Sequence, residues 1–373
     1  MPLPVGSRAV TGSPEGPLDA LDPLEAEDLR DRVHKALDDL IARQSDVLDG
    51  VSDELAPLMD AVADLLRGGK RLRPAFCYWG WRGAGGDDSS GIVTVAAALE
   101  LFQAAALIHD DVMDGSDTRR GQPAVHRRFA ALHRGNRWLG PSEDFGVAGA
   151  ILAGDLCLSW CDEMYAGSGL PAEPLAAGRA VFDRMRTELM CGQYLDMLEQ
   201  VLASTSVQRA RHVILYKSAK YSVQQPLLLG GTLAGAPDEL LRTYDDYGRA
   251  LGEAFQLRDD VLGVFGDPGA TGKPAGDDLR EGKRTVLVAV TLERCSPAQA
   301  AAVRRGLGDP HLDPAGVEGL REVMTECGAL DVVESMIDDL SAKALRSLEG
   351  AEVADPAREV LEQLVAAATA RSQ

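Results

Sequence analysis

The sequence predicts an all-α fold organised as one large helical domain. Aromatic residues make up 5% of the chain, alanine and leucine are abundant, and no run of alternating β-branched residues is sustained, so the periodicity favours helices throughout. A length of 373 residues suggests two domains on its own. No segment in the middle of the chain has the composition of a linker, so one domain is the simpler interpretation.

The elements follow in order from the N-terminus. Residues 1–24 are rich in proline, glycine and serine, so we expect them to be disordered and the helical domain to span 25–373. A helical pattern begins near Glu25 and runs to about Arg67, where the Gly68-Gly69 pair ends it. Further breaks in the pattern predict loops at residues 83–91, 134–146, 308–310 and 355–356.

The segment 95–109 (VAAALELFQAAALIH) is apolar on almost every side, which indicates a buried helix. It is followed by Asp110, Asp111 and Asp114, which project into one narrow sector because a helix turns about 100° per residue. Like charges this close become tolerable when hard cations such as Mg²⁺ lie between them. A solvated acidic helix end is the alternative. Carboxylates that end a buried helix, however, need a partner.

A second acidic cluster, Asp259 and Asp260, follows about 150 positions later and also ends a long apolar stretch. Gln256 lies one turn before Asp260, so we expect its amide to orient that carboxylate. Two such clusters fit a cage for several divalent ions around a diphosphate.

Four compact basic groups accompany the acidic clusters. They are Lys70, Arg71 and Arg73 beside Gly68-Gly69, Arg119 with Arg120, Lys217 with Lys220, and Lys273 with Lys283. Donors at a glycine break can converge on a phosphate, and Lys217 and Lys220 would share a helix face. Any one group could be a solvent-facing charge cluster. Together they favour a site for two diphosphates.

Charge and cysteine usage limit the other classes of function. A net charge of −20 argues against nucleic acid or an anionic membrane surface as the main partner. We find no apolar run of the roughly 18 to 20 residues that spans a bilayer and no signal pattern, so we expect no transmembrane segment and a cytoplasmic location. Six cysteines without CxxC pairs are expected to be mostly buried and reduced, namely Cys77, Cys157, Cys161, Cys191, Cys295 and Cys327.

In the order and spacing of its motifs, the chain resembles the trans-prenyltransferases, the isoprenyl diphosphate synthases or polyprenyl synthetases. The resemblance spans roughly residues 30 to 350. Its matching segments are GGKRLRP at 68–74, ALELFQAAALIHDDVMD at 98–114, RRGQPAVH at 119–126, GD at 154–155, GQYLD at 192–196, KSA at 217–219, FQLRDD at 255–260 and GKPAGDDLREGKRT at 272–285.

This resemblance implies the isoprenoid synthase fold, a single-domain bundle of long helices around a deep central cavity, usually paired as a homodimer. It also implies a Mg²⁺-dependent, head-to-tail condensation of isopentenyl diphosphate with an allylic diphosphate, which is dimethylallyl, geranyl or farnesyl diphosphate. Breaking the allylic C–O bond leaves a delocalised cation and a charged diphosphate, so cations fixed at that diphosphate stabilise the transition state. A dry cavity is equally necessary, because water would quench the carbocation.

The resemblance also assigns roles to residues. Asp110, Asp111, Asp114, Asp259 and Asp260 would hold about three Mg²⁺ ions against the allylic diphosphate. Arg119, Lys217 and Lys283 would complete this clamp, Lys70, Arg73, Gln103 and Arg120 would hold isopentenyl diphosphate, and Gln256 and Lys273 would support substrate binding. Many members carry histidine at the position of Gln103, and a side-chain amide can also donate a hydrogen bond.

The chain departs from the family pattern at Gly263, where the second motif commonly has a third aspartate. Asp267 is expected to lie too far along to replace it if the helix breaks at Gly266. The hypothesis from the sequence is therefore that Asp259 and Asp260 suffice.

Product length is expected to depend on side chains below the first aspartate. Ala105 and Ala106 are small there, and Phe102 lies about 12 Å below Asp110 as the first large obstacle. This predicts a product longer than fifteen carbons, with geranylgeranyl diphosphate as the main expectation. In the alternative, Phe102 is an ordinary core ring. Farnesyl and longer-chain polyprenyl synthases, a terpene cyclase without a second diphosphate, and a non-catalytic partner subunit also remain open.

Overall fold

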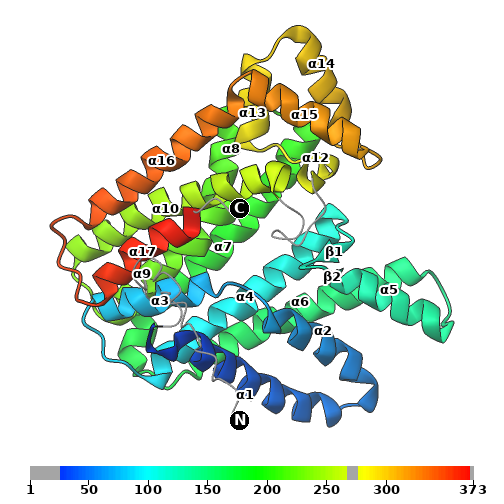
Figure 1. The fold of residues 1–373 in the computed structure, drawn as a ribbon. Coiled ribbons are helices and arrows are strands. Elements are labelled where there is room, and N and C mark those ends of the chain that lie inside the picture. Colours follow the sequence, from blue (N-terminus) through cyan, green and yellow to red (C-terminus); the bar gives the residue numbers. More distant parts are fainter. Residues whose placement is uncertain (1–25, 267–275, 370–373) are drawn as a thin grey trace, which may run out of the picture.

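Helices form nearly all of the regular structure in this computed structural model, which describes residues 26–266 and 276–369 (Figure 1). In those ranges the β structure is one antiparallel pair, β1 (Thr118–Arg119) with β2 (Gln122–Pro123). The all-α fold predicted from the sequence is therefore confirmed. The N-terminal segment 1–24 lies outside the described residues.

The helices follow one another through short connections. In the first half they are η1 (Ala26–Asp28), α1 (Leu29–Asp49), η2 (Asp53–Leu55), α2 (Ala56–Arg67), α3 (Leu72–Gly83), α4 (Ser90–Asp114), α5 (Val125–Asn136), α6 (Ser142–Ala166) and α7 (Ala172–Leu202). In the second half they are α8 (Val207–Val213), the π-helix η3 (Ile214–Gln224), α9 (Gln225–Leu233), α10 (Asp238–Phe265), α12 (Asp277–Glu281), α13 (Val286–Arg294), α14 (Pro297–Gly306), α15 (Pro314–Glu326), α16 (Ala329–Leu348) and α17 (Ala357–Thr369).

The long helix α4 lies at the centre of the bundle, as its apolar sequence predicts. The Ser89 hydroxyl caps its first turn by accepting a hydrogen bond from the Ile92 amide, which satisfies a backbone donor that the helix itself leaves unpaired. Gly115 ends it with a φ of +68°, a conformation that glycine adopts without a steric penalty. The helix packs against α6 along much of its length, and α10 packs in the same way against α16.

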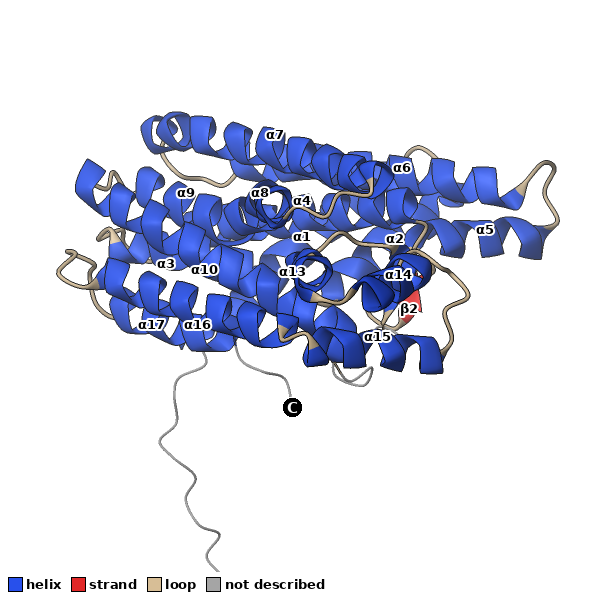
Figure 2. Ribbon diagram, turned by 90° about the horizontal axis from the view of Figure 1, so that it is seen from above, coloured by secondary structure: helices blue, strands red, loops and turns tan. Residues whose placement is uncertain are grey.

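The bundle contains two apolar cores. One joins α3, α4, α6 and α9 with the first half of α10, and the other joins the second half of α10 with α13, α15 and α16. In Figure 2, α6 and α7 lie along one edge of the bundle, while α16 and α17 lie along the opposite edge. The ends of α4 and α10 that carry the two acidic clusters meet between these layers.

Two helix boundaries differ from the predictions. The continuous pattern from Glu25 to Arg67 is interrupted, because α1 ends at Asp49 and Ser52 caps a new turn by accepting from the Glu54 amide. The loop predicted at 134–146 is limited to 137–141, because α5 continues to Asn136 and α6 begins at Ser142. Most residues at the ends of α5 and α6 are polar and exposed, which resembles loop composition, whereas Ser142 and Gly146 are buried.

The prediction that no apolar segment is long enough to cross a bilayer was wrong. Both α4 and α6 are long and apolar enough to cross a bilayer by length and hydropathy alone. The most apolar 18-residue stretch is 78% buried inside the structure in α4 and 39% buried in α6. Single polar residues interrupt each apolar run, for example Glu100 in α4 and Asp155 in α6, so that neither run is continuous. For α4 the apolar surface is accounted for by the core of the bundle.

The six cysteines are free thiols, as predicted, but only half of them are buried. Cys77, Cys157 and Cys161 are buried, Cys191 is exposed, and Cys295 and Cys327 are intermediate.

Candidate active site

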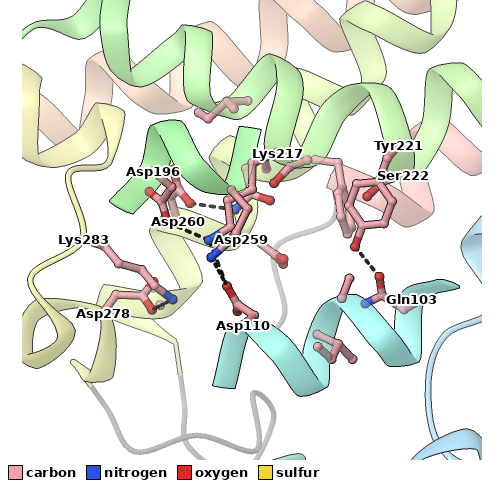
Figure 3. A pocket seen from close by; sticks show the side chains of 18 of the residues that line it. Gln103, Asp110, Asp196, Lys217, Tyr221, Ser222, Asp259, Asp260, Asp278 and Lys283 are labelled. Atoms are coloured by element: carbon pink, nitrogen blue, oxygen red, sulfur yellow. Dashed lines mark hydrogen bonds and ion pairs between the residues drawn. The ribbon is translucent and has the colours of Figure 1, made fainter. Parts of the chain in front are cut away.

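A cavity of about 510 Å³ lies where α4, α7, η3, α10 and α12 converge (Figure 3). The two acidic clusters predicted from the sequence meet there, since Asp110 lines one wall and Asp259 and Asp260 line the other. Positive side chains surround them, including Lys70, Arg73, Arg119, Arg120, Lys217 and Lys283. The cavity therefore combines the charges expected of a site for anionic substrates and cations.

Asp110 lies at the centre of the first wall. Its carboxylate accepts hydrogen bonds from Lys217 Nζ at 3.2 Å and from Gln193 Nε2 at 2.9 Å, and Lys217 also contacts Asp196 at 2.6 Å. Burial alone would raise the pKa of Asp110, but the cations Lys217, Lys283 and Arg119 hold it below its usual value. Asp110 is therefore ionised at neutral pH.

Lys217 is the cation that links this wall to α7. Burial opposes its charge, yet the carboxylates of Asp110 and Asp196 raise the pKa of Lys217 above its ordinary value. The ammonium group consequently stays charged inside the cavity and can bind an anion.

Asp111 is not one of the described residues that line the cavity. Its side chain is buried and accepts two hydrogen bonds from the Arg119 guanidinium, one of them from Nε at 2.9 Å. Arg119 also lies 3.5 Å from Asp110, so it bridges adjacent carboxylates of the first motif. The Asp111 carboxylate thus holds Arg119 at the cavity, and the role in cation binding that the resemblance implies for Asp111 stays a prediction.

Asp114 is the residue of the first motif whose surroundings fit a cation best. Its Oδ2 atom is buried, and no donor among the described residues hydrogen-bonds to it. Burial and the nearby charge of Asp110 raise the pKa of Asp114 to about 6. A buried carboxylate oxygen without a donor fits a position that a divalent cation would neutralise.

The second wall is formed by the end of α10. Asp259 faces the cavity as an exposed side chain, whereas Asp260 is buried. The hydrogen bond predicted from the sequence is present, because Gln256 Nε2 donates to Asp260 Oδ1 at 2.8 Å. Burial, together with the charges of Asp278 and Asp259, raises the pKa of Asp260 to about 8.

The donor set fits magnesium, although not as a closed protein cage. Mg²⁺ prefers oxygen ligands and keeps several from water or phosphate. Within the described ranges no three acidic, histidine or cysteine side chains meet around one point. A cation here would therefore take one or two carboxylates from the protein and its remaining ligands from water and a diphosphate.

Several of the residues predicted to hold the second diphosphate lie close together at the cavity. Arg73 donates to the Ser222 hydroxyl at 2.7 Å and lies over the Tyr221 ring at 4.2 Å, and Tyr221 donates its hydroxyl proton to Gln103. Lys70 also lines the cavity. These residues form a compact polar wall beside the acidic clusters.

Arg120 shows why two glycines precede the basic group. A Cβ on Gly68 or on Gly69 would lie 2.9 Å from the Arg120 guanidinium, and Gly69 has a φ of +115°. Arg120 is anchored by a hydrogen bond to the Leu65 carbonyl at 2.9 Å and reaches the cavity across this glycine surface. A side chain on either glycine would displace the guanidinium.

Two basic residues of the predicted groups serve the fold. Arg71 is buried and pairs with Glu100, so it does not converge on a phosphate with Lys70 and Arg73. Lys220 binds Glu188 at 2.6 Å and does not share the cavity face with Lys217. The latter prediction was wrong because the segment is a π-helix, in which residues three apart do not align as they do in an α-helix.

The lower cavity wall also differs from the prediction. Ala106 lines the cavity, whereas neither Ala105 nor Phe102 is part of the lining that the described residues form. Phe102 is 2% exposed and packs edge-on behind Tyr221, with 6.1 Å between the ring centroids. Tyr221, which the sequence analysis did not identify, lines the cavity in front of Phe102, and Phe255 is a second aromatic residue of the lining.

Several cavity residues were not assigned to the site. Gln193, Asp196, Asp278 and Arg284 lie in the quoted motifs, whereas Tyr221 and Ser222 lie just after the KSA motif. Gln193 and Asp196 are three residues apart on α7, a spacing that places them on one helix face and could have identified them. Tyr221 and Asp278 reach the site through tertiary packing, which local spacing does not reveal. Lys273 and Asp267 lie outside the described residues.

Comparisons with known proteins agree with this geometry. The family model described as polyprenyl synthetase matches residues 56–324. Geranylgeranyl diphosphate synthase of Methanosarcina mazei is 34% identical over 308 residues, which cover 80% of this chain and 87% of that protein. Octaprenyl diphosphate synthase of Escherichia coli is 30% identical over 286 residues, covering 76% and 80%.

Solved structures show the same fold. Geranylgeranyl pyrophosphate synthase of Corynebacterium glutamicum, determined in complex with isoprenyl diphosphate and magnesium, has a TM-score of 0.89 at 40% identity. The alignment covers 95% of this chain and 100% of that one.

The helical bundle and its charged cavity thus define a prenyltransferase of the isoprenoid synthase fold. The chain belongs to the polyprenyl synthetase family and is a transferase. Magnesium is typical of this family, and its members make products of different length.

Proposed function

We propose that this enzyme condenses isopentenyl diphosphate head to tail with an allylic diphosphate, in a magnesium-dependent reaction that yields geranylgeranyl diphosphate. The observation that carries the proposal is the meeting of Asp110 with Asp259 and Asp260 across one cavity that basic side chains surround. We propose that the described helices work as one prenyltransferase domain in the cytoplasm.

The residues of the first wall would bind the allylic diphosphate. Lys217, Arg119 and Lys283 supply fixed positive charge. Asp110 and Asp114, together with Asp259 and Asp260 on the opposite wall, would hold about three Mg²⁺ ions. Magnesium bound there would neutralise the charge that develops on the departing diphosphate. Because these groups are fixed before the reaction, they stabilise that charge without reorganising.

The polar wall would bind the second substrate. Lys70, Arg73 and Arg120 can contact the diphosphate of isopentenyl diphosphate, and Gln103 stands beside them. The double bond of this substrate then attacks the allylic cation, and the departed diphosphate can accept the final proton. A terpene cyclase would not need this second set of cations.

The cavity below the charged groups suits a prenyl chain. Ala106, Leu107, Leu189, Ile214 and Phe255 line it, so the carbocation would form among side chains that exclude water. A twenty-carbon product is supported by the similarity to two geranylgeranyl diphosphate synthases. The similarity to an octaprenyl diphosphate synthase keeps a longer product as the second candidate, and a farnesyl product is the shorter alternative.

We also propose a homodimer. Apolar side chains are exposed along α6 and α7, and those on α7 recur every three or four residues, which places them on one face. This apolar stripe consists of Phe145, Ile151, Leu152, Met190, Tyr194, Met197 and Val201. A row of exposed apolar side chains is typical of a protein interface, and a second copy of the same chain would cover it on both subunits.

The direct test is to incubate the purified protein with Mg²⁺, radiolabelled isopentenyl diphosphate and each of the three allylic starters, and to size the products. We expect a twenty-carbon product that disappears when the divalent cation is chelated. Asp260→Ala should reduce turnover by about 100-fold or more. Unchanged turnover of this variant would remove the second motif from the mechanism, and binding without turnover in the wild type would favour a non-catalytic partner subunit, the alternative that Gly263 suggests.

A further inference from the structure

A buried ion pair borders the polar wall of the cavity. The Arg71 guanidinium pairs with the Glu100 carboxylate, and their side chains are 1% and 4% exposed. Arg71 precedes the first turn of α3 and Glu100 belongs to α4, so the pair ties the start of α3 to the central helix. A buried ion pair adds little net stability, because the loss of solvation offsets most of the attraction. Stability alone therefore does not explain why two charges are buried here.

The backbone at Arg71 has an unusual conformation. Its φ of +54° and ψ of +28° lie in the left-handed region, which a residue with a Cβ rarely adopts. Such a conformation persists where the surrounding contacts enforce it. Arg71 stands directly between Lys70 and the first turn of α3, which carries Arg73. The directions in which Lys70 and Arg73 leave the backbone therefore depend on the conformation that the ion pair fixes.

The C-terminal end of α2 binds two of the guanidinium groups. Arg71 donates to the Leu66 carbonyl, and Arg120 donates to the neighbouring Leu65 carbonyl at 2.9 Å. Carbonyls in the last turn of a helix lack partners within it and carry a partial negative charge, so they suit cations. One helix end thus anchors both arginines.

Glu100 also offsets the crowding of positive charge around Arg120. Burial lowers the pKa of Arg120, and the guanidinium groups of Arg71, Arg119 and Arg73 lower it further. The Glu100 carboxylate opposes these effects. Without this carboxylate, the like charges of the wall would repel one another with no buried counter-charge between them.

We propose that Arg71 and Glu100 are positioning residues for the second substrate, and that their ion pair fixes Lys70, Arg73 and Arg120 in the arrangement that binds the diphosphate of isopentenyl diphosphate. This inference rests on the proposed function. The pair acts through these three cations and does not act on the allylic diphosphate. Its loss should consequently weaken the binding of isopentenyl diphosphate selectively.

Equilibrium binding of radiolabelled isopentenyl diphosphate to the purified protein tests the inference without turnover. Glu100→Gln keeps the size of the side chain and removes its charge. We expect this variant to bind isopentenyl diphosphate about tenfold more weakly. In steady-state kinetics the KM for isopentenyl diphosphate should rise by a similar factor, while kcat and the KM for the allylic diphosphate stay within about twofold. A purely structural role would not produce this selective change.

Two further variants separate positioning from stability. Arg71→Gly permits the left-handed backbone but leaves the Glu100 charge buried without this partner, so it should lower the temperature of thermal unfolding. Arg71→Gly combined with Glu100→Gln removes that charge and should unfold at a higher temperature than Arg71→Gly alone. Its affinity for isopentenyl diphosphate should nevertheless stay about tenfold below that of the wild type. Recovery of wild-type affinity in the double variant would overturn the inference.

Glu334→Gln is the matched control, because it breaks another largely buried pair, with Arg258, whose side chains are 17% and 5% exposed, respectively. Glu334 is not among the described residues that line the cavity, so this variant should lose stability and keep its affinity for isopentenyl diphosphate. Equal weakening by Glu334→Gln and Glu100→Gln would overturn the inference, as would unchanged affinity in Glu100→Gln. A wild-type protein that does not bind isopentenyl diphosphate would contradict the proposed function itself, and the inference with it.

Discussion

Asp260 is a residue of this cavity whose charge is needed for cation binding but lowers the stability of the folded protein. Its carboxyl group is buried beside Asp259 and Asp278, and burial with these charges raises its pKa from the ordinary value of 3.8 to about 8. A protein selected for stability alone would place a neutral residue there. A protein that recruits cations needs the charge, because a metal ligand must be deprotonated.

This conflict predicts a pH dependence of stability in the cation-free protein. A folded-state pKa above the unfolded value means that the folded state binds more protons, so the free energy of unfolding falls as pH rises from about 4 to about 8. Asp260→Asn removes the titrating group and should flatten this decline by a few kcal/mol. Denaturant unfolding at pH 5, 6.5 and 8, with chelator present, measures it.

The same substitution should abolish the stabilisation that Mg²⁺ with diphosphate gives to the wild type. Equal pH dependence in wild type and Asp260→Asn would show that Asp260 is not held protonated. An uncharged replacement on the exposed start of α10, Asp238→Asn, serves as the control.

Product length is the second property that depends on single residues. Tyr221 lines the cavity, while Phe102 packs behind it. Tyr221→Ala should therefore lengthen the product, as shown by chromatography of the dephosphorylated prenols. Phe102→Ala should chiefly destabilise the fold, by about 3 to 5 kcal/mol as for other buried aromatic residues.

The products of both variants are compared with those of the wild type from the same allylic starter. A longer product from Phe102→Ala, with an unchanged product from Tyr221→Ala, would contradict this assignment. That result would show that Phe102 limits the length of the product, as its spacing from Asp110 predicted.

The helices α7 and η3 approach each other closely at Gly192, and this contact sets the position of Lys217. A Cβ on Gly192 would overlap the backbone of Tyr216 and Lys217, so only glycine permits this contact. Gly192→Ala should push η3 away, lower the free energy of unfolding by about 1 to 3 kcal/mol and reduce turnover. Chemical denaturation and steady-state kinetics test both effects.

Gly319 on α15 provides the matched control, because a Cβ there meets nothing within 4 Å. Gly319→Ala should stabilise the protein by about 0.5 to 1 kcal/mol, the difference in helix propensity, and leave turnover unchanged. If Gly192→Ala behaves like Gly319→Ala, the contact between α7 and η3 does not position Lys217.

Local spacing explains which parts of the site were predictable from the sequence. The hydrogen bond from Gln256 to Asp260 follows from one helical turn, and the buried character of α4 follows from its apolar sequence. The pairing of Arg71 with Glu100 does not follow from spacing, because it depends on how α3 and α4 pack. The π-helical turn that separates Lys220 from Lys217 has no clear signal in composition either.

For the whole molecule, the exposed apolar stripe on α6 and α7 predicts assembly. Tyr194 is 66% exposed and lies in the middle of that stripe. Tyr194→Glu should shift the protein from dimer towards monomer in sedimentation equilibrium, because a charge buried in an apolar interface is costly. Glu173→Gln, near the start of α7 and outside the stripe, should leave the dimer unchanged. A wild-type protein that sediments as a monomer would contradict the prediction.

The charge distribution of the whole chain limits how the cavity can work. With a net charge of −20, the protein as a whole repels diphosphates, so the local cations and Mg²⁺ must reverse the sign of the potential inside the cavity. The two acidic walls are compatible with an anionic substrate only when cations lie between them and the substrate. They attract the divalent cations, and the cations in turn attract the substrate.

The most direct test of this account is calorimetric titration with farnesyl thiodiphosphate, whose carbon–sulfur bond resists ionisation. The account predicts that binding requires Mg²⁺ and weakens at least about tenfold when either Asp110→Asn or Asp260→Asn removes one acidic wall. Equal affinity with Mg²⁺ and with chelator, in the wild type and in both variants, would contradict it.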